Sequence, residues 1–282
     1  MPTLRIVFGL ILSLLTQIAL QGQNLEETFQ LGKTNFLMGN DQAASLALER
    51  VIFFGQGQYD AQAFEMLGQI SSRASQFEQA ARYFGSAVQA SFDEITVARN
   101  TLFKASAQLR NEDFQLALIE LLGMSDALPD SLIQAREFLL GVSYFNIQNF
   151  AESRQHFRGA IPPEAKNRIG QIDSLFNALE SIKHPNPKKA KLMSIFLPGL
   201  GQFYAGDIKN GINSLLLTGG FFTVGFIVAI NYSLVDAMVA VVPWIQRYYV
   251  GGFNRAAGIA ENKKKSKQDK LYQLILLTAR PN

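Results

Sequence analysis

The sequence predicts an all-α protein in which a helical solenoid is followed by a transmembrane helical hairpin. Two observations carry this prediction. Apolar and small residues recur with a period of 36 or 37 residues across residues 23–163, which is typical of stacked helix pairs. An uncharged apolar run then occupies residues 212–231, and about 20 helical residues are enough to cross a bilayer core of roughly 30 Å.

The composition excludes several kinds of chemistry. The 282-residue chain has no cysteine, two histidines and a net charge of +3, so disulfides, thiol nucleophiles and cysteine-ligated metals are ruled out. His156 and His184 are not at metal-ligand spacing, and no phosphate-binding loop or nucleophile elbow is present. We therefore expect no enzyme activity, no metal and no cofactor. The basic residues cluster beside apolar runs, which is typical of membrane flanks rather than of a nucleic-acid surface.

Residues 1–22 are predicted to be a secretory signal peptide. Arg5 precedes an apolar core at 6–20, and polar residues follow from Gln21, which is the layout of such signals. The apolar core is short for a span of about 20 residues. We expect cleavage near Gly22, and the alternative is an uncleaved anchor helix. Either interpretation places the following domain outside the cytoplasm.

Residues 23–163 are predicted to form about four repeats, each a pair of helices joined by a short turn. Every repeat has a small residue in its first helix, a small residue 12 positions later and a large apolar residue four positions after that. These three positions are Gly32, Ala44 and Leu48; Gly68, Ala80 and Phe84; Ala105, Ala117 and Leu121; Gly141, Ser153 and Phe157. Because one helix pair cannot bury its apolar stripe alone, neighbouring pairs must share a core.

This pattern resembles the tetratricopeptide repeat family over residues 25–163. The repeats around Gly68 and Gly141 match best, and those around Gly32 and Ala105 match less well. The units exceed the family's usual length of about 34 residues, and a closing proline appears only at 162–163. The predicted packing residues are Gly68, Ala80, Phe84, Ala87, Gly141, Phe157 and Ala160.

The resemblance implies a right-handed superhelix with a concave groove that binds a protein partner. Basic residues of the first helices are the candidates for lining that groove: Arg73, Arg99, Lys104 and Arg110. The sequence does not identify the partner.

A predicted capping helix at 164–182 follows the repeats, because its apolar residues keep helical spacing. Residues 183–191 are predicted to be a basic linker, since Pro185 and Pro187 both disfavour a helix. The composition then becomes strongly apolar.

Residues 192–260 are predicted to be a membrane module, followed by a basic tail at 261–282. Within the module we expect a half-helix at 192–206 and spans at 212–231 and 233–253. Asp236 lies near the start of the second span. A carboxylate in a membrane segment is costly and often functional, so Asp236 is a candidate functional charge; the alternative is that it stays among the lipid headgroups.

The start of this module resembles TM2-type and related small bacterial membrane domains. The resemblance rests on Pro198-Gly-Leu-Gly-Gln-Phe-Tyr-Ala-Gly206, on Gly211 and on the apolar hairpin that follows. It implies a membrane hairpin but no defined activity. The ordinary role of the glycines is helix packing, and a ligand or lipid-headgroup site is the alternative. The motif residues are Pro198, Gly199, Gly201, Gln202, Tyr204, Gly206 and Gly211.

Taken together, these features predict a membrane-anchored scaffold in the bacterial cell envelope, with an unknown protein partner in the repeat groove. Helical spans favour the inner membrane, with the repeats on its extracytoplasmic side. The sequence does not decide on which side of the membrane the tail lies. Two spans would leave both basic clusters outside the cytoplasm, against the positive-inside tendency. The alternative is a component of a membrane transport or assembly machinery in which the glycine-rich hairpin oligomerises.

Overall fold

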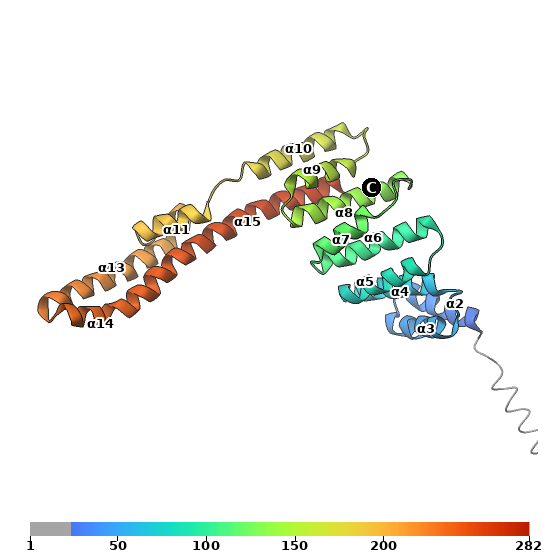
Figure 1. Ribbon diagram of the computed structural model, residues 1–282, viewed down its shortest axis with the longest axis horizontal. Coiled ribbons are helices and arrows are strands. Elements are labelled where there is room, and N and C mark those ends of the chain that lie inside the picture. Colours follow the sequence, from blue (N-terminus) through green and yellow to red (C-terminus); the bar gives the residue numbers. More distant parts are fainter. Residues whose placement is uncertain (1–23, 282) are drawn as a thin grey trace, which may run out of the picture. The chain divides into compact units, whose positions relative to one another are not determined.

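The computed structural model describes residues 24–281, and this part of the chain is helical, without a strand (Figure 1). The predicted signal peptide at 1–22 lies outside the described residues. The chain divides into two compact units, the first ending at Ala165 and the second running from Lys166 to Thr278, with the last residues from Ala279 assigned to the first unit. Each unit is described by itself.

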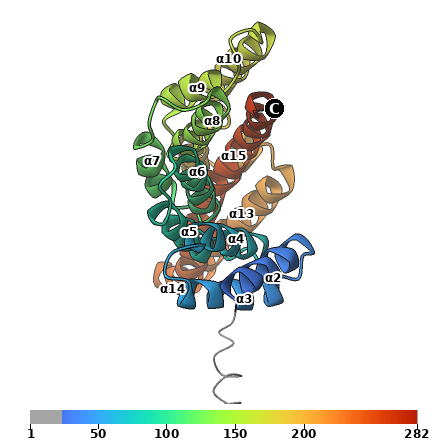
Figure 2. The same ribbon diagram turned by 90° about the vertical axis from the view of Figure 1, so that its right-hand side faces the viewer.

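The first unit consists of helices joined in pairs by short turns. Each helix packs chiefly against its neighbours in the sequence, and Figures 1 and 2 show the helices following one another in chain order. The helices are α2 (Leu25–Leu37), α3 (Asp41–Phe54), α4 (Asp60–Arg73), α5 (Phe77–Gln89), α6 (Glu94–Arg110), α7 (Phe114–Leu122), α8 (Asp130–Asn146) and α9 (Phe150–Gly159).

The same turn recurs within each pair at the predicted period. One residue adopts positive φ, and the next donates its backbone N–H to the carbonyl five residues earlier, which closes the helix end in the manner of a Schellman motif. The positive-φ residues are Gly39, Ser75, Glu112 and Gln148. The four hydrogen bonds, from Asn40 to Asn35, Gln76 to Ser71, Asp113 to Gln108 and Asn149 to Tyr144, all measure 2.9 Å.

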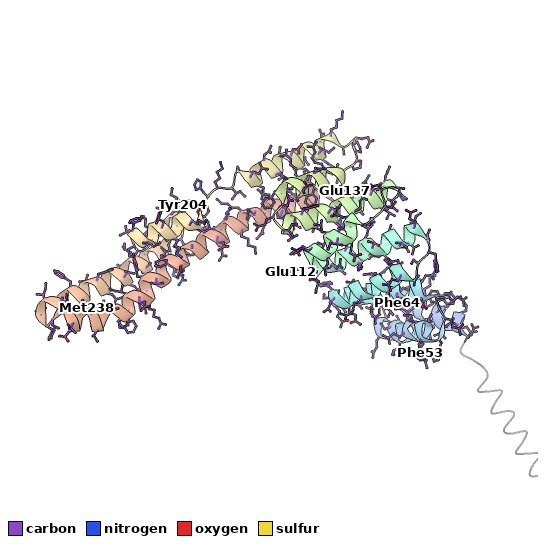
Figure 3. All side chains as sticks on the ribbon, in the orientation of Figure 1. Phe53, Phe64, Glu112, Glu137, Tyr204 and Met238 are labelled. Carbon is purple, nitrogen blue, oxygen red and sulfur yellow. The ribbon has the colours of Figure 1, made fainter. Side chains whose placement is uncertain are left out.

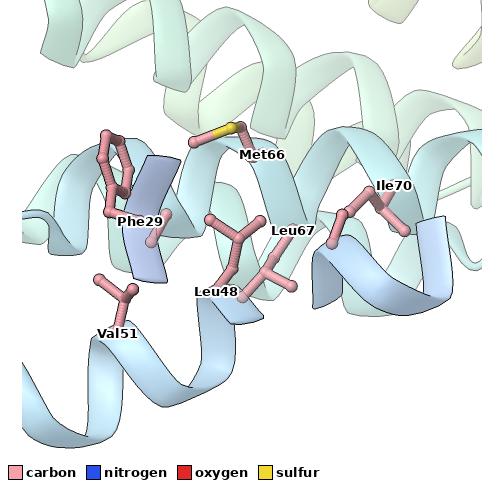
Figure 4. Packing of buried hydrophobic residues seen from close by; sticks show 8 residues of the cluster. Phe29, Leu48, Val51, Met66, Leu67 and Ile70 are labelled. Carbon is pink, nitrogen blue, oxygen red and sulfur yellow. The ribbon is translucent and has the colours of Figure 1, made fainter. Parts of the chain in front are cut away.

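Burial follows the same period. The small residues that open each second helix, Ala44, Ala80, Ala117 and Ser153, are all 0% exposed. The large residues that follow them, Leu48, Phe84, Leu121 and Phe157, are at most 2% exposed. Figure 4 shows that the first core combines side chains of α2, α3 and α4, including Phe29, Leu48 and Leu67. Successive pairs therefore share their cores.

Two glycines let an aromatic ring approach the facing helix. A Cβ on Gly68 would lie 2.7 Å from the ring of Phe84, and one on Gly141 would lie 2.7 Å from the ring of Phe157. The third pair has Ala105 and Leu121 at these two positions, both in one buried cluster. Phenylalanine therefore occurs only opposite glycine in these pairs, whereas leucine lies opposite Gly32 in the first pair and shares a cluster with Ala105 in the third.

The second unit begins with α10 (Lys166–Glu180), so the helix predicted to cap the repeats belongs to this unit. The other helices are α11 (Pro187–Phe196), α12 (Leu200–Tyr204), α13 (Ile208–Asn231), α14 (Leu234–Ile245) and α15 (Gly251–Ala279), with a π-helical turn, η1 (Gln246–Val250), between the last two. Helices α13 and α14 pack together as a hairpin.

The structure differs from the linker and half-helix predictions. Residues 183–191 are not a linker throughout, because α11 begins at Pro187, where proline is well accommodated at the first helical position. The side chain of Asn186 caps this helix by accepting a hydrogen bond from the N–H of Lys189 at 3.2 Å. A turn after Phe196 separates α11 from α12, so residues 192–206 are not one half-helix.

The second arm of the hairpin is also longer than predicted. Helix α14, the turn η1 and α15 follow one another without a break from Leu234 to Ala279. The predicted span at 233–253 is interrupted by the π-helical turn, and the predicted basic tail at 261–282 lies largely on α15. Ala256 and Ala260 of α15 are buried against Ala190 and Ala205. This contact stabilises the part of α15 that follows the apolar run.

Within the described residues, one helix is long and apolar enough to cross a membrane. It is α13, whose most apolar 18-residue window has a mean hydropathy of 1.8 and is only 6% buried. Its large side chains Leu216, Phe226 and Ile230 are 68%, 69% and 66% exposed. Much of the apolar surface of this helix therefore stays exposed, although one side of it packs against α14.

Candidate functional site

The predicted membrane motif forms a compact junction at one end of the α13–α14 hairpin. Figure 3 shows Tyr204 of the motif on the short segment before α13, whereas Met238 lies near the opposite end of the hairpin. Pro198 lies in the turn between α11 and α12. We call residues 184–211, together with the parts of α15 that contact them, the motif junction.

The glycines of the motif are positions of close backbone approach. Gly199 has a φ of +93°, and a Cβ there would lie 2.4 Å from the carbonyl oxygen of Gly211. A Cβ on Gly201 would lie 1.9 Å from the carbonyl oxygen of Ala190, and one on Gly211 would lie 2.7 Å from the ring of Phe203. These glycines hold α11, α12 and α13 together inside the unit.

Gln202 links three helices through buried hydrogen bonds. Its Oε1 accepts a hydrogen bond of 2.9 Å from Ser194 Oγ of α11, and its Nε2 donates one of 2.9 Å to the carbonyl oxygen of Gly252 of α15. Ser194 Oγ in turn accepts the N–H of Gly201 at 2.9 Å. Both Ser194 and Gln202 are 1% exposed, so each side chain depends on these partners for its polar atoms.

Tyr204 organises the entry to α11. Its hydroxyl oxygen accepts the N–H of Asn186 at 3.1 Å and lies 2.9 Å from Nδ1 of His184. The ammonium of Lys189 lies 5.5 Å from the centre of its ring, which is a cation–π geometry. Tyr204 therefore ties the start of α11 to α12.

Lysines of α15 complete the motif junction. Lys263 Nζ donates to the carbonyl oxygen of Gly206 at 3.0 Å, and Lys267 Nζ donates to that of His184 at 3.2 Å. Asp207 caps α13 by accepting the N–H of Asn210 at 3.1 Å. The pKa of the Asp207 carboxyl is lowered chiefly by its hydrogen bonds with Asn210. The charges of Lys263 and Arg255 lower this pKa to a smaller extent.

Asp236 has a local structural role at the start of α14. Ser233 caps this helix by accepting the N–H of Asp236 at 3.1 Å, and Ser233 Oγ donates to the Asp236 carboxylate at 2.6 Å. A carboxylate in the first turn of a helix is favoured by the helix dipole. The structure thus places this charge in the first turn of α14, and its position among the lipid headgroups stays a prediction.

In the first unit, the basic residues predicted to line a groove are held by partners within the chain. Arg73 pairs with Asp41 at 2.6 Å, Arg99 with Glu65 at 2.8 Å and Lys104 with Glu120 at 2.6 Å. The guanidinium of Arg110 lies 5.1 Å from the centre of the Phe77 ring. These contacts join different helices, so the basic residues stabilise the stack.

A charged cluster joins α8 to α9. His156 Nδ1 lies 2.7 Å from Glu137 Oε2, and the His156 ring stacks on Tyr144 with centroids 5.1 Å apart. Burial would raise the pKa of the Glu137 carboxyl, but the hydrogen bond with His156 and the charges of His156 and Arg136 outweigh it and lower the pKa. His156 thus has a packing and pairing role in this unit.

Sequence reasoning missed the partners of the motif. Gly252, Lys263 and Lys267 are not predicted as candidates, because their contacts join residues at least 50 positions apart in the sequence. Ser194 lies only seven and eight residues before its partners Gly201 and Gln202, but a single serine outside the motif gives no spacing signal. The lysines had been interpreted only as a membrane flank. Over residues 24–281, no group of three or more histidine, aspartate or glutamate side chains is placed to hold a metal ion.

A comparison of this chain with protein-family models, curated proteins and solved structures finds no match.

Proposed function

We propose that this protein is a membrane-anchored scaffold of the bacterial cell envelope. Its first unit is a tetratricopeptide-like solenoid that binds another protein, and its second unit is a transmembrane hairpin that holds the complex at the inner membrane. The observation that carries the proposal is the exposed apolar surface of α13.

The recurrence of the turn and of the buried positions supports the solenoid. Four helix pairs repeat the same positive-φ turn and the same buried small residue at steps of 36 or 37 residues. Neighbouring pairs share cores and are joined by ion pairs such as Arg99 with Glu65. This is the energetic pattern of repeat proteins, in which each unit contacts only its neighbours.

Exposed apolar side chains of the first unit support a protein partner. Phe53 and Phe54 of α3 are 81% and 63% exposed, and Ile119 of α7 is 67% exposed. Clusters of large exposed apolar side chains mark surfaces that bind other molecules. The basic residues Arg73 and Arg99, which are engaged within the chain, are secondary to these surfaces as candidates for partner contacts.

The membrane anchor is tested by extraction and by protease access. We expect the full-length chain to stay with the membrane after high-salt and alkaline washes and to need detergent for release. In spheroplasts with an intact inner membrane, added protease should digest the first unit. Release by salt alone, or protection of the first unit until the membrane is opened, would contradict the proposed anchor or its orientation.

The scaffold role is tested by crosslinking in cells followed by purification of the full-length chain. We expect one defined protein to be recovered with the wild type and to be lost with Phe53→Ser and Phe54→Ser together. The matched control is Leu192→Ser, another exposed apolar position (54%), in the second unit. Recovery of the same protein with the double variant would exclude the α3 surface as its binding site.

The oligomerising alternative has one specific observation in its favour. Gly219 and Gly220 of α13 have no atom within 4 Å of the place a Cβ would take, so a second helix could approach there. Leucine at these positions would then abolish self-association while leaving the motif junction folded. Leucine at Gly199 or Gly201 is no test of this alternative, because these glycines pack inside the unit.

A further inference from the structure

A polar cavity lies between α13 and the second arm of the hairpin, next to the motif junction. Its volume is about 250 Å³, and its lining includes Asn210, Asn213, Ser214 and Thr218 of α13, Arg247 of η1 and Arg255 of α15. Drug-sized ligands occupy cavities of roughly 300–1,000 Å³, so this one suits a smaller group. No acidic residue of the described chain lines it.

The two arginines give the cavity a positive charge that the described residues leave unpaired. Neither Arg247 nor Arg255 makes an ion pair or hydrogen bond within residues 24–281. The Asp207 carboxylate interacts electrostatically with Arg255, but it is engaged in capping α13 and in accepting a hydrogen bond of 2.7 Å from the Asn210 side chain. The guanidinium groups therefore remain available to an anion.

Two hydroxyl groups that line the cavity lack a partner. Ser214 Oγ and Thr218 Oγ1 are buried, and neither makes a hydrogen bond. Thr218 is 1% exposed. On the same helix, Thr223 Oγ1 satisfies itself by donating to the carbonyl oxygen of Gly219 at 3.0 Å. A buried hydroxyl without a partner is unfavourable, so both groups are free to donate to a ligand.

The backbone around the cavity brings these groups together. Arg247 and Tyr248 lie on the π-helical turn η1, and such turns occur frequently at functional sites. A Cβ on Gly252 would lie 2.9 Å from Ser214 Oγ, so a side chain there would crowd the hydroxyl. The turn and the glycine together keep the hydroxyl and guanidinium groups on one cavity.

We propose that this cavity binds a phosphate group, and that in the membrane this phosphate belongs to a phospholipid headgroup. Arginine forms paired hydrogen bonds with phosphate oxygens, and the unpartnered hydroxyls supply further donors. The assignment of this phosphate to a lipid rests on the proposed membrane anchor. The stack of Phe221, Trp244 and Tyr248 adjoins the cavity on the side of the apolar hairpin, and aromatic residues of this kind lie at headgroup level.

The single tryptophan of the chain provides the measurement. Trp244 stacks on Tyr248, which lines the cavity, with ring centroids 6.2 Å apart. The full-length protein in a neutral, phosphate-free detergent is titrated separately with dioctanoyl phosphatidylglycerol, dioctanoylglycerol and inorganic phosphate, while Trp244 fluorescence is recorded. We expect saturable binding of phosphatidylglycerol and no saturable change with dioctanoylglycerol. Inorganic phosphate should bind at least about tenfold more weakly than phosphatidylglycerol.

The variants separate binding from folding. Arg247→Gln and Arg255→Gln should each weaken phosphatidylglycerol binding about tenfold or more, the size expected from losing hydrogen bonds to a charged group. Thr218→Val keeps the shape of the side chain and should weaken binding a few-fold. The matched control is Lys265→Gln, which removes one positive charge from an exposed position of α15. Circular dichroism verifies that each variant keeps its helix content.

The results of these titrations distinguish a phospholipid from free phosphate as the ligand. Equal binding of phosphatidylglycerol and dioctanoylglycerol would overturn the phosphate site, as would unchanged affinity in both arginine variants. Equal affinity for inorganic phosphate would keep the phosphate site and overturn the lipid as its source. A chain that proves soluble without detergent but binds inorganic phosphate with the same arginine dependence would overturn the membrane anchor alone.

Discussion

The pairing of residue sizes across each helix pair is the clearest feature at the scale of single residues. Glycine faces phenylalanine at Gly68 with Phe84 and at Gly141 with Phe157, whereas Ala105 and Leu121 share a buried cluster in the third pair. A ring that approaches within 2.7 Å of an added Cβ leaves no room for it. The facing pair therefore acts as one packing unit whose total volume is limited.

This limit predicts the stability of a glycine variant. Gly68→Ala should lower the free energy of unfolding by about 1–3 kcal/mol, since an extra methyl group overpacks the core. Combining it with Phe84→Leu should recover much of the loss, because that double variant copies the third pair. The control Gly85→Ala, whose Cβ would have no neighbour closer than 3.6 Å, should not destabilise. Chemical unfolding followed by circular dichroism measures all three, and a fully stable Gly68→Ala would refute the steric argument.

The lowered pKa of Glu137 predicts that the stability of the first unit depends on pH. Because the pKa of the Glu137 carboxyl in the folded protein is lowered below its ordinary value of 4.5, folding favours the ionised form. The contribution is complete above the unfolded pKa and is lost as the pH falls from about 4.5 through the lower folded value. We expect Glu137→Gln to destabilise the first unit at pH 7 and to differ less from the wild type at pH 3.

The matched control for this experiment is Glu49→Gln, at an exposed position of α3 with no ion pair among the described residues. Its difference from the wild type should stay near zero at both pH values. Urea unfolding at pH 7 and at pH 3 supplies the comparison. A Glu137→Gln difference that grows as the pH falls would contradict the assigned direction.

At the scale of elements, the buried hydrogen bonds of Gln202 connect α11, α12 and α15. Gln202→Leu would remove the donor to the Gly252 carbonyl and the acceptor for Ser194, at a cost of about 1–3 kcal/mol for buried polar groups. Hydrogen exchange should therefore accelerate in α11 and α12. Tyr204→Phe removes contacts that lie nearer the surface and should have a smaller effect. Equal exchange in the wild type and in Gln202→Leu would show that these helices are held together by packing alone.

The elements also show which parts of the structure could be predicted from the sequence. The helix pairs could be, because burial and turns repeat locally at one period, and so could α13, because its apolar run is continuous. The start of α11 could not, since Pro187 was interpreted as a helix breaker although it occupies the first helical position. The motif residues, Gln202 and Tyr204 among them, could be predicted, but their contacts with α15 could not, because Gly252 and Lys263 lie 50 or more residues after Gln202 and Gly206.

At the scale of the whole molecule, the two units differ in how much of their large apolar side chains they bury. The first unit buries large residues such as Leu48 and Phe157 completely. The second unit leaves the apolar face of α13 open, with only 6% of its most apolar window buried. Exposure of this much apolar surface to water is unfavourable by about 25 cal/mol per Å², so the second unit is the part expected to need lipid or detergent.

This contrast predicts the behaviour of a truncated chain. Residues 24–165, expressed alone, should be soluble and monomeric in buffer without detergent and should unfold cooperatively, because the core clusters around Leu48, Phe84 and Leu121 consist of residues of the first unit. The matched chain of residues 24–281 should aggregate unless detergent is present. Size-exclusion chromatography with light scattering measures both. A detergent-free monomer of residues 24–281 would mean that the α13 surface is covered within the protein itself, and the membrane anchor would then have no physical basis.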